Sequence, residues 1–565
     1  MAKIGNSPTL FFVTSPRTPW RFIPEMETLS RVASGKPWNK KTQEEFMEAL
    51  VHEDFYVGTK SPKDPAFSAR DRINRAPKAY GFVKLKPVVE LTDAGRVLMQ
   101  AHRKDDVLLR QLLKFQLPSV YHVQDKNAST IFYVKPFLEM LRLIDYFGSL
   151  TFDEVKLFGM QLTDYRKFDT VCRKIEEFRL RKAESKGRYK KFYADYCQRE
   201  LQSMYSDEII TGDIYTRESK NASLQKFINT KNANLRDYTD ACFRYLRATG
   251  YVSISQAGHS LSIAPEKQDA VDYILRTIDR NPCYVDDLEG YEAYLFNPEL
   301  PVLYTDNINN LLRDIHKYDP NVNTKGMSIL ELRELGYRLM EDSKQEALSR
   351  EISSVKDFEQ FDDIVDVFSK IGTKTYYDEP LQFEWNTWRA MTMIDGGDIR
   401  ANLKFDDHAQ PMSTAAGNEA DIVCDYGDFC VNVEVTLQSG QKQYDNEGEP
   451  VARHVGKQAA RSGKPTYCFF IAPKITHATY AHFYVLYHEN ISLYGGKSKI
   501  IPLELSSFKK MILDSRKACY VPEPKHIKAI FDTAEKLRET ADNEVEWFNK
   551  VNEAARNWLK LPLES

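Results

Sequence analysis

Residues 421–436, DIVCDYGDFCVNVEVT, carry the pattern that decides the fold of the C-terminal part of the chain. In the second half of this stretch, valines at every other position alternate with Asn432, Glu434 and Thr436. Because side chains of a β-strand point alternately to its two faces, one face is apolar and the other polar. The stretch therefore predicts a strand whose polar face carries a carboxylate.

Glu434 lies in the middle of this valine-rich strand, and Asp421 opens the strand before it. A buried charge costs several kcal/mol unless something pairs with it, and a divalent cation is one such partner. Two acids carried by neighbouring strands form half of an oxygen-ligand metal site. The pair Asp421 and Glu434 by itself also allows a second interpretation, in which Glu434 is a structural glutamate held in a salt bridge.

Further ionisable residues lie in the neighbouring segments. They are Glu447, Glu449, Arg453, His454 and Lys457 on or beside the next predicted helix, and Glu384 in the upstream helical segment QFEWNTW. Acids from one helix and two strands, with basic residues nearby, suit hydrolysis of a phosphodiester, in which Mg²⁺ bridges a scissile oxygen and polarises an attacking water. His454 either takes part in this chemistry or orients a neighbour.

The segments around these acids alternate between strand and helix. We expect strands at 421–424 and 429–435 and helices within 372–395 and at 449–463. The apolar runs TYCFFIA and KIIPLEL predict two more strands, at 466–472 and 499–505. This order of elements is typical of an α/β domain, which we place at 376–565.

The N-terminal half is predicted to be mainly helical with small β-wings. A helix is expected at 41–54, and residues 66–98 read as helix, strand, turn, strand and helix, which is the outline of a winged helix. A second such outline covers 237–263, and long helices are expected at 137–147, 151–162 and 173–199. The helix expected at 173–199 is basic. The aromatic residues interleaved with its charges indicate either a nucleic-acid contact or a packed aromatic seam.

The predicted architecture is multidomain α+β: a mainly helical N-terminal DNA-recognition half with winged-helix subdomains, a helical linker and a C-terminal α/β nuclease domain. The expected boundaries are 1–150 for a first recognition subdomain, 151–288 for a second, 289–375 for the linker and 376–565 for the nuclease.

Charge is distributed unevenly along the 565 residues, although the net charge is only −3. Residues 1–110 carry 19 Lys and Arg against 13 Asp and Glu, and residues 164–200 carry 12 against 7. A polyanion could dock on these blocks. The candidate contacts to bases or phosphates are Arg17, Arg70, Arg72, Arg75 and Lys78.

Several classes of protein are disfavoured by the sequence. No run approaches the ~18 apolar residues of a membrane span, and the first residues do not resemble a secretory leader, so we expect no membrane partner and a cytoplasmic location. The eight cysteines include no CxxC pair and read as reduced core thiols. The chain has no P-loop, HExxH or G-x-S-x-G motif.

Several phrases together resemble one known family. Asp421 and Glu434-Val435-Thr436 are similar to the PD-(D/E)XK nuclease motif, and AAGNEAD, VEVTLQSGQKQY, GEPVARH and YCFFIAP resemble the AlwI/MlyI/PleI group of type IIS restriction endonucleases and their strand-nicking relatives. The resemblance extends to TSPRTPWRFIPEMETLS, AFSARDRINRAPKAYGFV, LTDAGRVL and LLKFQLPS in the N-terminal half.

The resemblance implies a Mg²⁺-dependent type IIS restriction endonuclease of bacterial origin. Its helix-rich N-terminal half recognises a short asymmetric sequence in double-stranded DNA, and its C-terminal domain cuts a few base pairs away, leaving 5′-phosphate and 3′-hydroxyl ends. Asp421, Glu434 and the backbone carbonyl of Val435 match the metal ligands. Glu384, Glu447 and His454 match further positions of the active site.

Two departures from the motif matter. Ala420 stands where the motif has Pro, and Thr436 stands where it has Lys. The second removes the cation that commonly orients the attacking water, so Lys442, His454 or Lys457 are the candidates for that role.

Three alternatives to a double-strand-cutting enzyme remain open from the sequence. One nuclease domain holds one active site, so cutting both strands requires a transient homodimer or a small second subunit. The chain could instead be the large subunit of a heterodimer that nicks one strand. The second alternative is a non-catalytic winged-helix regulator with a decayed nuclease domain. The third is a scaffold protein.

Overall fold

The computed structural model describes the chain except for residues 1, 5–6, 54, 57, 60, 126–129, 186–188, 217–222, 395, 415–418, 519–521 and 564–565. The chain forms two compact units, Met1–Arg338 and Leu339–Ser565. The boundary lies within helix α16 (Ile329–Lys356), inside the segment predicted as a linker. The mixed α+β class is thus confirmed, while the finer division into four parts stays a prediction. Across the described residues, we find no helix with the length and apolarity that crossing a membrane requires.

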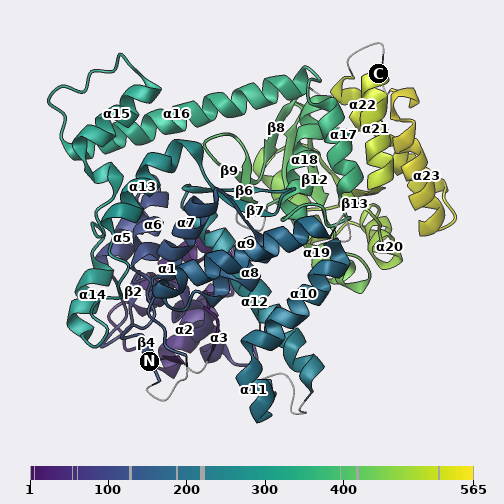
Figure 1. The fold of residues 1–565 in the computed structure, drawn as a ribbon. Coiled ribbons are helices and arrows are strands. Elements are labelled where there is room, and N and C mark those ends of the chain that lie inside the picture. Colours follow the sequence, from purple (N-terminus) through teal and green to yellow (C-terminus); the bar gives the residue numbers. More distant parts are fainter. Residues whose placement is uncertain are drawn as a thin grey trace. The chain divides into compact units, whose positions relative to one another are not determined.

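The first unit is mainly helical, and its α-helices run from purple to teal in Figure 1. They are α1 (Phe22–Ala33), α2 (Lys40–Leu50), α3 (Pro65–Ile73), α4 (Ala76–Ala79), α5 (Asp93–Gln100), α6 (Asp105–Lys114), α7 (Pro136–Phe147), α8 (Phe152–Leu157), α9 (Phe168–Glu184), α10 (Tyr189–Met204), α11 (Ser206–Thr211), α12 (Leu224–Arg247), α13 (Gln268–Thr277), α14 (Leu288–Phe296) and α15 (Ile308–Tyr318). Strand β1 (Ala2–Ile4) pairs in parallel with β4 (His122–Gln124).

The first predicted helix-hairpin-helix is present. Strands β2 (Val83–Lys84) and β3 (Glu90–Leu91) form an antiparallel pair between α4 and α5. Thr92 caps α5 by accepting a hydrogen bond from the Gly95 backbone N–H. The strands are shorter than expected because Tyr80 and Gly81 still belong to the end of α4, where Gly81 adopts a φ of +77°.

The second predicted hairpin follows α12. Strands β6 (Val252–Ser255) and β7 (Ser260–Ile263) pair antiparallel, and the short strand β5 (Leu150–Thr151) extends this sheet on the far side of β7. The sequence had indicated the hairpin but not its third strand, because two residues carry no periodic pattern.

The predicted single helix over 173–199 is wrong. Helix α9 ends at Glu184 and α10 begins at Tyr189, with residues 186–188 between them outside the described part of the chain. The ring of Phe178 on α9 contacts the ring of Tyr196 on α10, with centroids 5.1 Å apart. The aromatic residues therefore pack between two helices, and the interpretation as an aromatic seam is confirmed.

The second unit is built on a five-stranded sheet, the green arrows of Figure 1. Its order is β14 (Lys499–Glu504), β13 (Thr466–Ala472), β12 (Cys430–Val435), β11 (Ile422–Asp425) and β8 (Asp398–Ala401). Strand β11 is antiparallel to both of its neighbours, and β12, β13 and β14 are parallel. Strand β13 is completely buried, which accounts for its continuous apolar sequence.

Helices surround this sheet. They are α17 (Phe361–Lys370), α18 (Glu379–Ile394), α19 (Gln441–Ser462), α20 (His477–Leu486), α21 (Leu505–Lys517), α22 (Pro524–Thr540) and α23 (Glu544–Arg556). The predicted elements of this unit correspond to α18, α19 and the strands β11, β12, β13 and β14. The strands that the sequence did not predict are β8 and the small antiparallel pair β9 (Leu403–Phe405) and β10 (Pro411–Thr414). Helix α19 begins eight residues before the predicted position 449, because Pro450 stands inside it and looks like a start signal.

Candidate active site

The sheet register brings the two central acids together. Ile422 of β11 lies opposite Val433 of β12, so one step further along the ladder Asp421 lies opposite Glu434. Residues directly opposite in an antiparallel pair point to the same face. The two carboxylates predicted to act together are therefore cross-strand neighbours on one face of the sheet.

Asp421 is held by the backbone of the strand beside it. Its Oδ2 accepts a hydrogen bond of 2.9 Å from the backbone N–H of Val435. Its own carbonyl accepts a hydrogen bond of 2.8 Å from the N–H of Asn402 at the end of β8. Both contacts fix the start of β11, so the carboxylate has little freedom to turn away.

Glu434 and Glu447 are held by neighbours on β12 and α19. His454 Nδ1 lies 2.7 Å from Glu434 Oε1, and the Glu434 residue is only 6% exposed. Thr436 donates a hydrogen bond of 3.0 Å from its hydroxyl to Glu447 Oε1, which also accepts one of 3.3 Å from Gln438. The spacing of these residues on α19 and the strand thus brings both acids to the same end of β12.

The electrostatics show that the acids lie near one another. Burial, together with the negative charge of Glu434, raises the pKa of Asp421 well above its ordinary value. Burial and then the charge of Glu447 do the same to the pKa of Glu434. Burial and then the charges of Asp421, Asp378, Glu434 and Glu447 raise the pKa of Glu384, which lies on α18. The four carboxylates form one repelling cluster.

In the described part of the chain, no arginine or lysine neutralises the central pair. Among the described residues, neither Asp421 nor Glu434 forms an ion pair with an arginine or a lysine. Arg453 pairs instead with Glu449 on its own helix, at 3.1 Å. A closed structural salt bridge, the alternative interpretation of Glu434, therefore lacks its partner.

The three candidates for the missing motif lysine are not equivalent. His454 contacts Glu434 directly, whereas Lys442 and Lys457 are exposed on α19. Burial, with the positive charge of Arg453, lowers the pKa of His454 to about 4. A neutral imidazole beside a carboxylate can orient that carboxylate and accept a proton.

The donor set of this cluster fits Mg²⁺. Across the described residues, no three His, Cys, Asp or Glu side chains form a complete metal site by themselves. Mg²⁺ does not require one, because it is usually bound by one or two carboxylates and keeps several waters. A divalent cation would also relieve the mutual repulsion that raises the pKa values of these acids.

The predicted DNA contacts divide into two groups. Arg72 forms an ion pair with Glu25, a buried residue, and stacks on Tyr56, and Arg70 donates to Gln43 at 2.8 Å. These side chains help to tie α3 to other elements of the first unit.

The remaining three differ in exposure. Arg17 pairs with Asp237 and Arg75 with Asp71, and their side chains are 50% and 45% exposed. Lys78 is half-buried over the ring of Tyr121, and burial lowers its pKa. Arg17 and Arg75 are thus the two most accessible to a large ligand.

Sequence reasoning missed the buried polar residues between the acids. Thr436 was noted only as a replacement for Lys, and the structure makes it the hydrogen-bond donor to Glu447. Asn432, on the Glu434 face of β12, is fully buried, and neither polar atom of its amide bonds to a described residue. Its place in the alternating pattern, two residues before Glu434, was the available signal.

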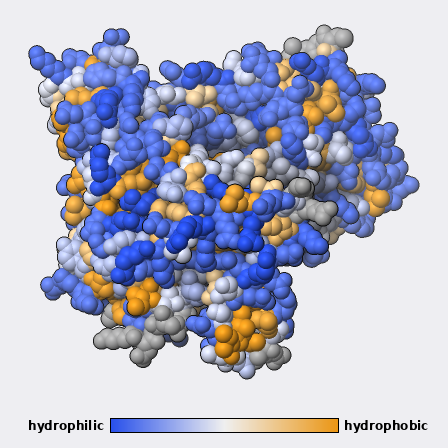
Figure 2. Space-filling model, viewed as in Figure 1, coloured by the Kyte–Doolittle hydropathy of each residue, from blue (hydrophilic) through white to orange (hydrophobic). Residues whose placement is uncertain are grey.

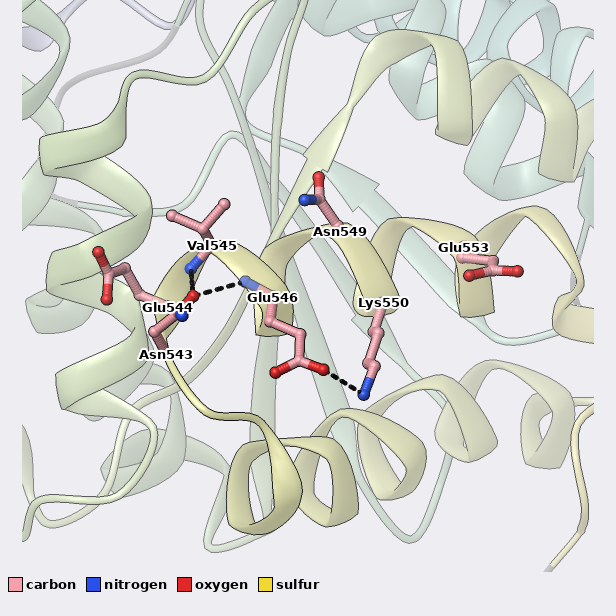
Figure 3. A pocket seen from close by; sticks show the side chains of 7 residues that line it. All are labelled: Asn543, Glu544, Val545, Glu546, Asn549, Lys550 and Glu553. Atoms are coloured by element: carbon pink, nitrogen blue, oxygen red, sulfur yellow. Dashed lines mark hydrogen bonds and ion pairs between the residues drawn. The ribbon is translucent and has the colours of Figure 1, made fainter.

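A separate surface hollow of about 680 Å³ lies along α23 (Figure 3). Asn543 accepts hydrogen bonds from the N–H groups of Val545 and Glu546, and Glu546 pairs with Lys550 at 2.6 Å. Its polar groups thus cap and brace one helix, and it shares no residue with the carboxylate cluster.

Hydrophilic residues predominate on the face of the molecule in Figure 2, with separate apolar patches among them. One apolar patch lies over α11 at the bottom of this view, where Ile210 is 82% exposed. It belongs to the first unit and holds none of the acids.

Comparison with known proteins links this chain to a family. The model of the AlwI restriction endonuclease family matches residues 79–511, a stretch that contains all four carboxylates. No curated protein matches the chain. Among solved structures, a similar one is the small subunit (R.BspD6I2) of the heterodimeric restriction endonuclease R.BspD6I. It is 26% identical, the match covers 35% of this chain and 96% of that one, and the TM-score is 0.28.

Proposed function

Since the chain belongs to the AlwI restriction endonuclease family and is therefore a DNA-cleaving restriction enzyme, we propose that it is a type IIS restriction endonuclease. It binds a short asymmetric sequence in double-stranded DNA and, with Mg²⁺, hydrolyses phosphodiester bonds a few base pairs outside it. The products carry 5′-phosphate and 3′-hydroxyl ends.

The observation that supports this proposal best is the juxtaposition of Asp421 and Glu434 across β11 and β12. These two carboxylates and the backbone carbonyl of Val435 would hold the metal ion. Bound there, Mg²⁺ supplies Lewis-acid polarisation of a phosphoryl oxygen and lowers the pKa of water. The nuclease domain thus has the PD-(D/E)XK arrangement with the lysine position changed to threonine.

The protein's own residues set up this site in three ways. The backbone N–H of Val435 aims Asp421, and His454 holds Glu434. Thr436 and Gln438 fix Glu447 at the edge of the cluster, where its carboxylate can accept a proton from an approaching water. Glu384 adds a fourth carboxylate from α18 that strengthens the attraction for a cation.

The first unit is proposed to recognise DNA through its winged-helix-like hairpins. Arg17 and Arg75 are its best-exposed candidate contacts, and Arg70, Arg72 and Lys78 contribute from less accessible positions. Charged contacts to phosphates would fix the register on the duplex, so that the cut falls at a set distance.

One site cleaves one strand at a time. A double-strand break therefore needs a transient homodimer or a small second subunit, and nicking of a single strand is the alternative outcome. The small subunit named among the similar structures belongs to a heterodimeric enzyme. Sequencing both strands of a cut product decides between the two outcomes.

The test is cleavage of supercoiled plasmid in Mg²⁺ and in EDTA. Asp421→Ala or Glu434→Ala is expected to lower cleavage by at least about 10³-fold, since each removes a ligand of the metal. Binding to the mapped site, measured in Ca²⁺, should be retained. Normal cleavage by both variants would refute the site, and site-specific binding without any cleavage by the wild type would favour the non-catalytic regulator.

A further inference from the structure

A second cavity, of about 400 Å³, opens on the nuclease sheet beside the carboxylate cluster. It is formed by the ends of β8 and β11 and the last turns of α19. The residues used below are Arg400, Asn402, Ala420, Val423, Gln458 and Arg461. Its size suits the sugar and phosphate of one nucleotide.

This cavity lies on the same face of the sheet as the Asp421 side chain. Val423 lies two residues after Asp421 on the same strand, so both side chains point to the same face. Ala420, which precedes Asp421, and Asn402, whose N–H donates to the Asp421 carbonyl, also line it. A strand of DNA with one phosphate at Asp421 would lay a neighbouring nucleotide in this space.

The rim of the cavity carries exchangeable positive charge. Arg461 pairs with Glu419 at 3.1 Å, with side chains 70% and 61% exposed. Arg400 pairs with Asp398 at 3.2 Å, with side chains 62% and 66% exposed. Such exposed pairs contribute little energy, so a phosphate can displace the carboxylate from either guanidinium.

We propose that this cavity binds the phosphodiester backbone of the cut strand next to the scissile bond, with Arg400 and Arg461 contacting its phosphate oxygens. This inference rests on the proposed function. It assigns positioning residues on the nuclease unit itself, separate from the recognition contacts of the first unit.

The charge of the active site supplies the physical reason. Glu384, Asp421, Glu434 and Glu447 repel one another and would repel a polyanion in the same way. Cations on the protein must offset that repulsion for the scissile phosphate to approach. Arg400 and Arg461 lie on the elements that border Asp421, while Arg453 is paired with Glu449.

The experiment uses a duplex containing a site that the wild-type protein cuts, mapped beforehand by sequencing digested DNA. Single-turnover cleavage is measured with Mg²⁺ for Arg400→Ala, Arg461→Ala and Arg461→Lys. Each alanine variant is expected to slow cleavage about tenfold, since one charge-assisted hydrogen bond is lost. Lysine at 461 should recover part of the rate. Arg350→Ala, which removes an exposed arginine on α16, serves as the matched control.

A second arm separates phosphate binding from a merely structural role of the Arg461–Glu419 pair. Because Glu419 competes with phosphate for Arg461, Glu419→Gln is expected to speed cleavage, by about threefold. A neutral methylphosphonate at the phosphate next to the scissile bond should slow the wild type. In the Arg461→Ala variant, the same methylphosphonate should cause no further slowing of cleavage.

The two proposals fail in different ways. No Mg²⁺-dependent cleavage by the wild type would refute the proposed function. Cleavage by the wild type with equal rates for Arg400→Ala, Arg461→Ala and Arg350→Ala would refute only this inference. Equal slowing of cleavage by Glu419→Gln and Arg461→Ala would also refute only this inference, because the Arg461–Glu419 ion pair would then have a purely structural role. Thermal unfolding of each variant confirms that the fold is intact.

Discussion

At the scale of single residues, the second unit buries carboxylates in its sheet, where burial disfavours their charged form. Asp421 and Glu434 face each other across two strands, and burial raises both of their pKa values. An ion pair with an arginine or a lysine would remove this cost, yet among the described residues neither acid has one, and the neighbour of Glu434 is His454. The proposed Mg²⁺, arriving from solution, would offset this cost.

The pH dependence of stability follows from these shifts. Asp421 and Glu434 have raised pKa values in the folded protein, so the folded state binds more protons than the unfolded one. Stability then falls as pH rises through their folded pKa values. His454, whose pKa is lowered to about 4, has the opposite slope, but only up to its ordinary value of about 6.5.

We therefore expect these two carboxyls to lower the midpoint temperature of the metal-free protein as pH rises above their ordinary pKa values of about 4 and through their raised pKa values in the folded state. The decrease should be smaller for Asp421→Asn combined with Glu434→Gln. Because Mg²⁺ competes with protons, added Mg²⁺ should stabilise the wild type more at the higher pH and leave the double variant unchanged. Differential scanning fluorimetry measures both effects, and parallel profiles for the two proteins would contradict them.

At the scale of elements, helix α19 positions half of the site. It carries Glu447 and His454 and packs along β12 and β13. Gly456, two residues after His454, lies against the short 3₁₀ helix η6 (Ser492–Tyr494), where a Cβ atom would overlap the Tyr494 carbonyl oxygen. The close approach of backbone to backbone requires glycine here.

Gly456→Ala is therefore expected to push α19 away from η6, to cost about 1–3 kcal/mol of unfolding free energy and to lower cleavage. Gly448→Ala in the same helix is the control. Its Cβ would meet the side chains of His482, at 3.4 Å, and Tyr444, at 3.6 Å, which are ordinary contacts, and alanine favours a helix by up to about 1 kcal/mol. Urea denaturation of the two variants measures the difference, and equal stabilities would show that α19 is not held at Gly456.

At the scale of the whole molecule, the chain divides into two compact units, and we propose that the first recognises DNA and the second cleaves it. The proposed DNA contacts lie in residues 1–338 and all four carboxylates in residues 339–565. Substitutions in the first unit should then change binding without changing the chemical step.

Arg75→Ala tests this division. It should weaken DNA binding and reduce the slope of the logarithm of affinity against the logarithm of salt concentration by about one, if Arg75 contacts a phosphate. The single-turnover cleavage rate at saturating DNA should stay at the wild-type value. Titrations at several salt concentrations measure the slope. An unchanged affinity and site preference would remove Arg75 from the interface.

The sequence by itself determined the central strands, the acids on them and the two hairpins of the N-terminal half. These features depend on local rules, such as the alternation of apolar and polar side chains along β12. Local rules failed where two signals conflicted, as at Pro450 inside α19, and where α9 ends at Glu184, within the predicted single helix.

Only the tertiary structure decided which residues meet. The pairing of Ile422 with Val433 makes Asp421 and Glu434 neighbours, and the packing of α19 brings His454 to Glu434. It also commits Arg72 to Glu25 and leaves Arg75 exposed, although the two lie three residues apart. Contacts between distant segments depend on register and packing, which no single stretch of sequence encodes.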